Sequence, residues 1–284
     1  MKRWLSSAVL TCALLLPATP ALAQSRPLVT EDPETVPVGF ILLEAGLDFL
    51  HGAVFPVTGL TGNLTRIGAY GFSVGVSSIA EIQVDGAMLD RLNVTAFDPT
   101  APLAPLFAGS VSEASSFGDV TVGAKIRFLS ETVRRPAIAL RFATRLPFLD
   151  LDTGIGAQTT DFLVGVSLGK TVRSVRMVAN TGFGILGDPV RGDRQNQVFT
   201  YGGSVARAVA AGAEIVAELN GRLDLGTDIP PLGTDNRLGI RVGGRYTYGP
   251  VRIDAAFIIG ANEGDSPWGL TFGATWVFKA FELK

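Results

Sequence analysis

Residues 268–278 read Trp-Gly-Leu-Thr-Phe-Gly-Ala-Thr-Trp-Val-Phe, and their side chains alternate between two kinds. The large apolar residues Trp268, Phe272 and Phe278 share one face, whereas Thr271 and Thr275 share the other face with two glycines. A period of two places successive side chains on opposite sides of a β-strand. This stretch therefore predicts a strand with one apolar and one polar face.

The same alternation returns along the chain and predicts twelve strands. We expect them near residues 38–50, 62–76, 80–92, 118–129, 137–147, 160–170, 175–186, 197–207, 213–223, 236–247, 251–260 and 268–281. Short connections alternate with longer ones, which fall near 51–61, 93–117, 148–159, 187–196, 224–235 and 261–267. All sixteen prolines lie outside the strand interiors, as a sheet that needs every N–H group requires. An even number of strands joined in this way is typical of an outer-membrane barrel.

The composition of the two faces indicates how such a barrel is oriented. The polar face holds mostly glycine, serine, arginine and glutamate, whereas the other face is bulky and almost free of charge. The first set suits a lumen and the second suits lipid. Aromatic residues near the strand ends suggest two interfacial girdles: Phe128, Tyr246, Trp276 and Phe278 at the short turns, and Phe49, Phe162, Phe199, Tyr201 and Trp268 at the loops. We predict an all-β, transmembrane antiparallel β-barrel of about 12 strands, with short periplasmic turns and longer extracellular loops. A secreted β-sandwich is the alternative.

Composition excludes several other classes of protein. The 284 residues are 47% apolar and 18% charged, with a formal net charge of −2, one cysteine and one histidine. These values argue against a disordered chain, a disulfide scaffold and a basic nucleic-acid binder. We expect no cofactor, no metal site and no nucleic-acid partner, because one histidine and so few thiols make a transition-metal site improbable.

The beginning of the chain carries the features of a secretory signal. Lys2 and Arg3 precede an apolar stretch, and an Ala-x-Ala pattern ends at Ala23. We predict a signal peptide over 1–23 that is cleaved near Ala23 after Sec-type export, a periplasmic arm over 24–37, and the barrel over 38–284. The only cysteine, Cys12, lies within the signal. The arm is polar and rich in proline, which suggests either a flexible leader or a plug folded into the barrel mouth.

Charged residues on the polar faces are the candidates for lining the lumen. We expect Glu81 to lie opposite Arg127, and Glu214, Glu218 and Arg222 to lie opposite Arg245, Arg241 and Arg237, so that most charges pair across the wall. Arg141, Arg145 and Arg176 lack an obvious partner and are the better candidates for contact with a solute. The full set of candidates is Glu44, Asp48, Glu81, Asp85, Lys125, Arg127, Arg141, Arg145, Arg176, Glu214, Glu218, Arg241 and Arg245.

The single histidine, His51, is the one residue that suggests catalysis as an alternative to transport. Barrel lipases and deacylases depend on a histidine near the outer rim, and His51 follows the first predicted strand. Asp48 is close in sequence, but alternation places it on the opposite face, and no serine is spaced as a partner. We therefore expect no catalytic residues and no enzyme, with a lipid hydrolase near His51 as an alternative.

Several short motifs resemble one family of outer-membrane proteins. Arg-Pro-Leu-Val-Thr-Glu-Asp at 26–32, Leu-Glu-Ala-Gly at 43–46 and Gly-Ala-Lys-Ile-Arg-Phe at 123–128 are similar to segments of the family named for the meta-pathway of phenol degradation. The resemblance covers most of the chain in order. It implies a barrel that transports small, often hydrophobic or aromatic, compounds.

The sequence and this resemblance together predict passive passage of small solutes across a bacterial outer membrane. The expected partners are outer-membrane lipids, a small-molecule solute and the barrel assembly machinery, and the expected state is a monomer or small homo-oligomer. A structural barrel that conducts nothing is a further alternative.

Overall fold

The computed structural model describes residues 26–107, 111–147, 153–156, 159–226 and 229–282. Within these ranges the chain forms thirteen strands and one short 3-10 helix, Ala104–Phe107. The strands are β1 Phe40–Phe55, β2 Leu60–Gly75, β3 Ala80–Phe97, β4 Glu113–Ser116, β5 Val120–Leu129, β6 Ala137–Leu146, β7 Asp161–Val172, β8 Val175–Gly187, β9 Gln195–Ala210, β10 Ala213–Asp224, β11 Arg237–Tyr248, β12 Val251–Gly260 and β13 Trp268–Lys279. No described helix is long and apolar enough to cross a membrane. The predicted signal, 1–23, lies outside the described residues.

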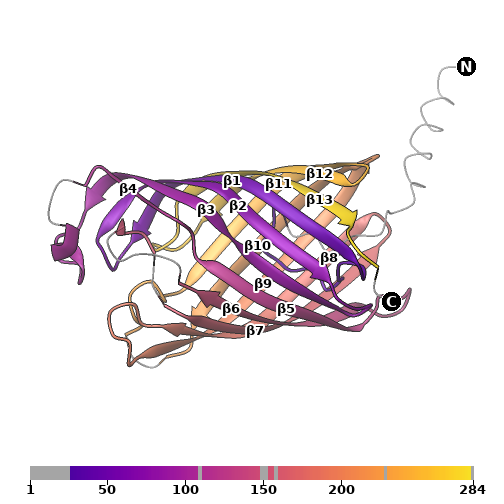
Figure 1. Ribbon diagram of the computed structural model, residues 1–284, viewed down its shortest axis with the longest axis horizontal. Helices are drawn as coiled ribbons and strands as arrows, with labels where there is room; N and C mark the ends of the chain where they lie inside the picture. Colours follow the sequence, from indigo (N-terminus) through magenta and orange to yellow (C-terminus); the bar gives the residue numbers. More distant parts are fainter. Residues whose placement is uncertain (1–25, 108–110, 148–152, 157–158, 227–228, 283–284) are drawn as a thin grey trace, which may run out of the picture.

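Twelve of the described strands close into an antiparallel barrel, and this confirms the predicted fold (Figure 1). Neighbouring strands of the barrel follow one another in sequence, with β5 beside β3. The barrel closes where β13 pairs with β1, from Phe40 opposite Lys279 to His51 opposite Trp268. The thirteenth strand, β4, pairs only with β3 near one end of the barrel. We call this the loop end and the opposite end the short-turn end.

The predicted loop at 51–61 is wrong. Residues 51–55 continue β1, and β2 begins at Leu60, so the connection shrinks to residues 56–59. Gly52 has a φ of +64°, and the pairing of β1 with β2 shifts between Leu50 and Ala53. A bulge of this kind inserts an extra residue and resets the alternation, which hides the second half of the strand from a period-two pattern.

The predicted loop at 93–117 also contains more strand than expected. β3 continues to Phe97, and Glu113–Ser116 returns along it as β4, with Asn93 opposite Glu113. Within this connection Phe107 is buried whereas Leu106 is exposed. The connection therefore extends the wall of the barrel beyond the closed twelve-stranded section.

The predicted strand register is right for one pair of strands and wrong for another. Glu214, Glu218 and Arg222 of β10 lie opposite Arg245, Arg241 and Arg237 of β11, as expected. Glu81 of β3, however, lies opposite Lys125 of β5 and not opposite Arg127. Long connections join both pairs of strands, residues 225–236 between β10 and β11 and residues 98–119 between β3 and β5, but only the second connection contains a further strand, β4. No local turn therefore sets the register at that pair.

The outer face of the barrel is apolar and accessible. Phe272 and Trp276 of β13 are 45% and 47% exposed, and many other large apolar side chains are exposed in the same way, among them Ile82, Phe142, Phe183, Ile215 and Phe257. Several rings pack against each other on this face, including Phe183 with Phe199 and Trp276 with Phe278. An apolar surface of this extent is the signature of a surface that contacts a partner or lipid and not water.

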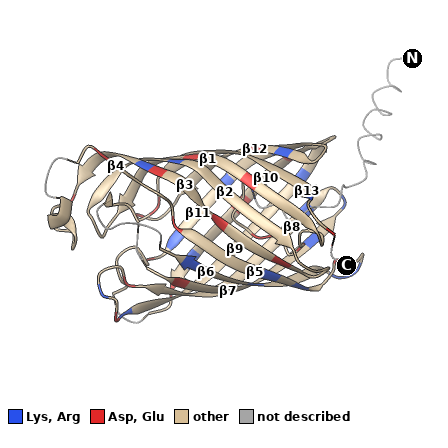
Figure 2. Cartoon of the chain, viewed as in Figure 1, with Lys and Arg blue, Asp and Glu red and all other residues tan. Residues whose placement is uncertain are grey.

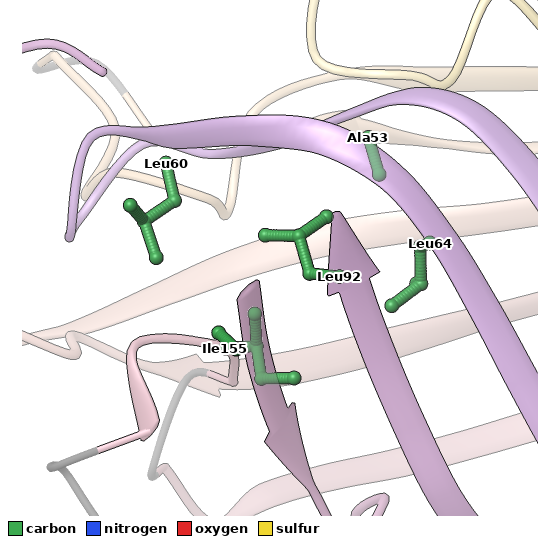
Figure 3. Packing of buried hydrophobic residues seen from close by; sticks show 6 residues of the cluster. Ala53, Leu60, Leu64, Leu92 and Ile155 are labelled. Atoms are coloured by element: carbon green, nitrogen blue, oxygen red, sulfur yellow. The ribbon is translucent and has the colours of Figure 1, made fainter. Parts of the chain in front are cut away.

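The interior carries most of the charge on the strands, together with one apolar cluster at the loop end. Acidic and basic positions recur along the length of the strands (Figure 2). Leu60, Leu64, Leu92 and Ile155 point toward a common space between β2, β3 and the segment after β6 (Figure 3). This cluster fills the space inside the part of β1, β2 and β3 that extends toward the loop end, and it forms an apolar wall there.

Candidate functional site

Residues 26–37 of the N-terminal arm lie inside the barrel. Their polar contacts reach side chains of nine strands on all sides of the wall: β1, β3, β5, β6, β8, β10, β11, β12 and β13. A segment outside the barrel cannot touch the inward side of every one of these strands. The contacts therefore place the arm within the lumen, as the plug hypothesis requires.

An arginine of the wall holds the middle of the arm. Arg176 of β8 donates from Nη2 to Asp32 Oδ1 at 2.6 Å and from Nε to Asp32 Oδ2 at 2.9 Å. Its remaining nitrogen, Nη1, donates to Glu131 in the turn after β5 at 2.5 Å. The fork of a guanidinium matches a carboxylate in this two-bond geometry, which fixes direction as well as charge. Arg127 forms a further ion pair with Glu34 of the arm.

A carboxylate of the wall, two strands further round the barrel, binds the backbone of the arm. The N–H groups of Val29 and Thr30 donate to Glu218 Oε2 of β10 at 2.8 and 2.6 Å. The hydroxyl of Thr30 donates to the same oxygen. Glu218 is almost fully buried, and these donors compensate for its removal from water. Asn180 of β8 adds an amide pair, because it accepts from the Glu31 N–H at 2.6 Å and donates to the Glu31 carbonyl at 2.9 Å.

The second half of the arm, residues 32–36, covers a buried ion pair. Lys125 Nζ lies 3.0 Å from Glu81 Oε1, and the two side chains are 1% and 0% exposed. Lys125 also donates to the Asp32 carbonyl of the arm at 2.9 Å, while Glu81 accepts from the Val36 N–H. A buried pair is tolerated only when further hydrogen bonds satisfy it, and here the arm supplies them.

The first described residue of the arm, Arg26, lies in an acidic part of the lumen. Its guanidinium donates to Thr271 Oγ1 at 2.7 Å and lies 3.5 Å from Asp48 and 3.8 Å from Asp254. Neither carboxylate oxygen of Asp254 has a hydrogen-bond partner within the described part of the chain. The positive charge of Arg26 therefore stabilises this buried carboxylate electrostatically, without a hydrogen bond.

Nine of the thirteen sequence-predicted lumen residues contact the arm directly: Glu44, Asp48, Glu81, Lys125, Arg127, Arg141, Arg176, Glu218 and Arg241. The pair Glu214 and Arg245 forms a hydrogen bond of 2.7 Å across β10 and β11. Asp85 and Arg145 line a cavity described below. The structure thus brings the candidates together around the arm and not around an open central axis.

The expectation that Arg141, Arg145 and Arg176 lack partners is wrong. Arg141 lies 3.5 Å from Glu31 of the arm and from Asp85. Arg145 lies 2.5 Å from Asp161 and 3.6 Å from Asp119, and Arg176 binds the arm as described. The partners of Arg141 and Arg176 in the arm and in connections could not be found by comparing adjacent strands, whereas Asp161 lies directly opposite Arg145 on the adjacent strand and could have been found.

A cavity of about 580 Å³ lies between the arm and the loop end of the barrel. Arg26 and Val29 of the arm belong to its lining, together with charged residues of β1, β2, β3 and β6. Apolar residues of strand ends and connections complete it: Phe55, Val57, Ile155, Leu186 and Leu232. The cavity is therefore amphipathic, with charge toward the arm and hydrocarbon toward the loops. A volume of this order accommodates a small organic molecule.

His51 and its surroundings differ from a hydrolytic centre. The His51 ring stacks on Trp268 with a centroid distance of 5.2 Å, next to the outward ring of Phe257. Asp48 lies on the inward face, where Thr271 donates to it at 2.7 Å. Within the described ranges no three His, Cys, Asp or Glu side chains are grouped so as to hold a metal ion.

Glu131, in the turn outside the strands, has a perturbed ionisation. Partial burial acts to raise its pKa, but the hydrogen bond from the Thr171 N–H and the charges of Arg176 and Lys170 outweigh that effect. The pKa of Glu131 is therefore held below its ordinary value of 4.5. The carboxylate stays ionised and supports the arginine that binds the arm.

Sequence analysis missed several inward residues. Arg252 and Asp254 alternate with Val251, Ile253 and Phe257 on β12, so the period-two pattern carried the signal that would have found them. Gln83, which donates to Glu81 at 2.8 Å, carries the same signal on β3. Arg66 is harder to find, because Gly68 has a φ of +63° and lies at a shift in the pairing of β2 with β1 that resets the alternation.

Comparisons with known proteins agree with the fold. No family model matches the chain, and no curated protein matches it in sequence. Among solved structures, an outer-membrane channel from Pseudomonas putida F1 is 13% identical, with a TM-score of 0.57 over 87% of this chain and 98% of that one. The NanC porin is 10% identical, with a TM-score of 0.50 over 86% of this chain and all of that chain, 100%. At these identities the likeness establishes the shared β-barrel fold.

Proposed function

We propose that this protein is an outer-membrane channel for the passive passage of small solutes and that residues 26–37 are its resident plug. The observation that carries the proposal is the arm itself, which makes hydrogen bonds or ion pairs to inward residues of nine strands within a closed barrel. The exposed apolar outer face supports placement in a lipid bilayer, reached by export with cleavage near Ala23. Outer-membrane lipids and the assembly machinery are then its partners, and a monomer or small homo-oligomer is its state.

The cavity supports a proposal about the solute. Its apolar wall, built from residues such as Val57, Leu186 and Leu232, suits a molecule with a hydrocarbon part. This agrees with the small, often hydrophobic or aromatic, compounds implied by the resemblance to the meta-pathway family. The structures that share the fold are named as an outer-membrane channel and a porin, which supports transport across the outer membrane.

Two alternatives make different predictions. A lipid hydrolase would need His51 to act as a base, but its ring stacks on the outward Trp268 and Asp48 is engaged inside the barrel. We therefore propose a channel and not an enzyme. A structural barrel would keep the arm in place permanently and conduct nothing.

Liposome swelling separates these possibilities. Purified mature protein and its Asp32→Asn variant are reconstituted and tested with small sugars, aromatic alcohols, aromatic acids and amines. A channel gives solute entry with the native protein and faster entry with the variant. Entry of no solute through either protein would contradict the channel, and hydrolysis of added lipid that is lost in His51→Ala would favour the enzyme.

A further inference from the structure

Four exposed arginines gather in one sector of the short-turn end without a partner. They are Arg134 and Arg135 in the turn between β5 and β6, Arg173 in the turn between β7 and β8, and Arg207 near the end of β9. Every other arginine of the described ranges makes a hydrogen bond or an ion pair through its side chain, whereas these four make none. The sector therefore carries positive charge that the described chain does not use.

Backbone contacts bring the segments of these arginines together. The N–H of Ala208, next to Arg207, donates at 3.0 Å to the carbonyl of Ser174, next to Arg173. Lys170 of β7 donates to three carbonyls of the β5–β6 turn, which contains the other two arginines. The three segments therefore lie beside one another, and the four charges share one part of the rim.

The one acid in these turns is already bound. Glu131 lies 2.5 Å from Arg176 and 3.4 Å from Lys170. The β7–β8 turn and the neighbouring β9–β10 turn, residues 211 and 212, contain no acidic residue. An anion that neutralises the four arginines must therefore come from outside the described chain.

Arg207 lies on the outer face of the barrel, among apolar side chains. Val175 of β8 and Ile215 of β10 lie opposite it in the strand register. On β9 itself Val205 and Val209 flank it, and the strand ends at residue 210. These two valines are 47% and 52% exposed. An arginine on the lipid-facing side is tolerated near the interface, where its apolar stem lies along hydrocarbon and its charge reaches the headgroups.

The backbone of Arg173 gives a second, independent observation. Its φ is +56°, and it is the one described residue other than glycine with a positive φ. Arg173 is the first residue of the two-residue turn between Val172 and Val175. In the matching turn between β11 and β12 the first residue is Gly249, with a φ of +60°. Glycine suits this position because it has no Cβ. An arginine here does not favour the turn, which indicates a role for its side chain.

We propose that Arg173 and Arg207 form a binding site for the phosphate of an anionic phospholipid. The acyl chains lie along the apolar outer face of β9 and β10, and Arg134 and Arg135 add positive charge at the rim. A guanidinium matches phosphate oxygens in a two-bond geometry, and clustered arginines at a membrane surface attract anionic lipids. Because the short turns are the predicted periplasmic end, the lipid belongs to the periplasmic leaflet. The proposal rests on the proposed placement in the outer membrane and not on conduction.

The test is thermal unfolding of the purified mature protein in detergent with added lipid. The probes are phosphatidylglycerol, phosphatidylcholine with the same acyl chains, lipid A, and inorganic phosphate without chains. We expect phosphatidylglycerol to stabilise the protein at a concentration about tenfold lower than phosphatidylcholine, whose choline group brings a positive charge to the arginines. Equal stabilisation by the two phospholipids would overturn the proposal. So would equal or stronger stabilisation by lipid A or by inorganic phosphate.

Two variants and one control locate the site. Arg173→Gly removes a charge and suits the positive φ, whereas Arg207→Gln removes a charge on the outer face. Each should reduce the preference for phosphatidylglycerol several-fold. Arg191→Gln, at an exposed ion pair with Asp193 in the connection between β8 and β9, should keep the native preference. Native preference in both site variants would overturn the assignment. Heat-modifiable migration on gels confirms that each variant is folded before the measurement.

The outcomes also separate this proposal from the channel itself. A preference for phosphatidylglycerol that is lost in the variants, together with entry of no solute into liposomes, would keep the lipid site and reject the channel. Solute entry, together with equal stabilisation by the two phospholipids, would keep the channel and reject the lipid site.

Discussion

Arg176 and Asp32 are 144 residues apart in sequence and form two hydrogen bonds, of 2.6 and 2.9 Å, inside the barrel. Arg176 is part of the wall and Asp32 is part of the arm. The pair is largely shielded from water, with the two side chains 8% and 12% exposed. One guanidinium therefore ties the position of the plug to the register of β8.

Asp32→Asn should loosen the plug. The variant replaces a charge-assisted, two-bond contact by a neutral one and leaves the Arg176 charge uncompensated on that side. We expect more frequent opening events in single-channel recordings than in the native protein. Asp193→Asn, which removes only an exposed pair with Arg191, serves as the control and should record like the native protein. Identical traces for all three proteins would argue against this anchor.

Lys125→Met should destabilise the barrel, because it leaves the buried Glu81 carboxylate without its cation. Breaking one side of a buried pair costs about 3 kcal/mol. The midpoint of thermal unfolding in detergent should fall accordingly. The double variant Lys125→Met, Glu81→Leu should recover part of the loss. If the single variant unfolds at the native temperature, the buried pair contributes no stability.

A disulfide should capture the arm in place. A first side-chain carbon at Gly202 of β9 would lie 3.4 Å from Thr30 Oγ1, a spacing that suits a cysteine bridge. The predicted mature chain has no cysteine, so Thr30→Cys with Gly202→Cys supplies the only two thiols. Oxidation should cross-link the pair and suppress opening events, and reduction should restore them. Failure of the two cysteines to react would place the arm elsewhere.

The stability of the barrel should depend on pH through Glu131. Its pKa is held below the ordinary value of 4.5 by the Thr171 N–H, Arg176 and Lys170, against the effect of partial burial. A lowered pKa stabilises the folded state above the unfolded-state value, and this contribution is lost as the pH falls through the folded-state pKa. Thermal unfolding should therefore shift to lower temperature below about pH 4.5. Glu131→Gln should show a smaller shift over the same range.

Much of the barrel could be predicted from local patterns. Alternation such as that of Trp268, Phe272 and Trp276 identifies a strand and its lipid-facing side, because both depend on neighbouring residues in one segment. The position of Arg241 opposite Glu218 could also be predicted, because both residues lie on strands with clear alternation. The bulge at Gly52 broke that pattern, and there the predicted loop was wrong.

The candidate site depended on contacts that no local pattern carries. The partners of Arg176 and Arg141 lie in the arm, about 110 to 144 residues earlier in the chain. Glu44, Gly71 and Asp85 lie side by side on the inner face because three adjacent strands, β1, β2 and β3, align them. Alternation places each residue on the inner face but says nothing about its height relative to the others, so the arrangement needed the structure.

The single-channel conductance of mature protein that lacks residues 24–36 shows whether the arm is the plug of a channel. We expect a folded barrel with a conductance several-fold above that of the native protein, because the segment bound by Arg176, Glu218 and Arg241 is gone. The same conductance in both folded proteins would contradict the proposal that the arm is the plug of a channel.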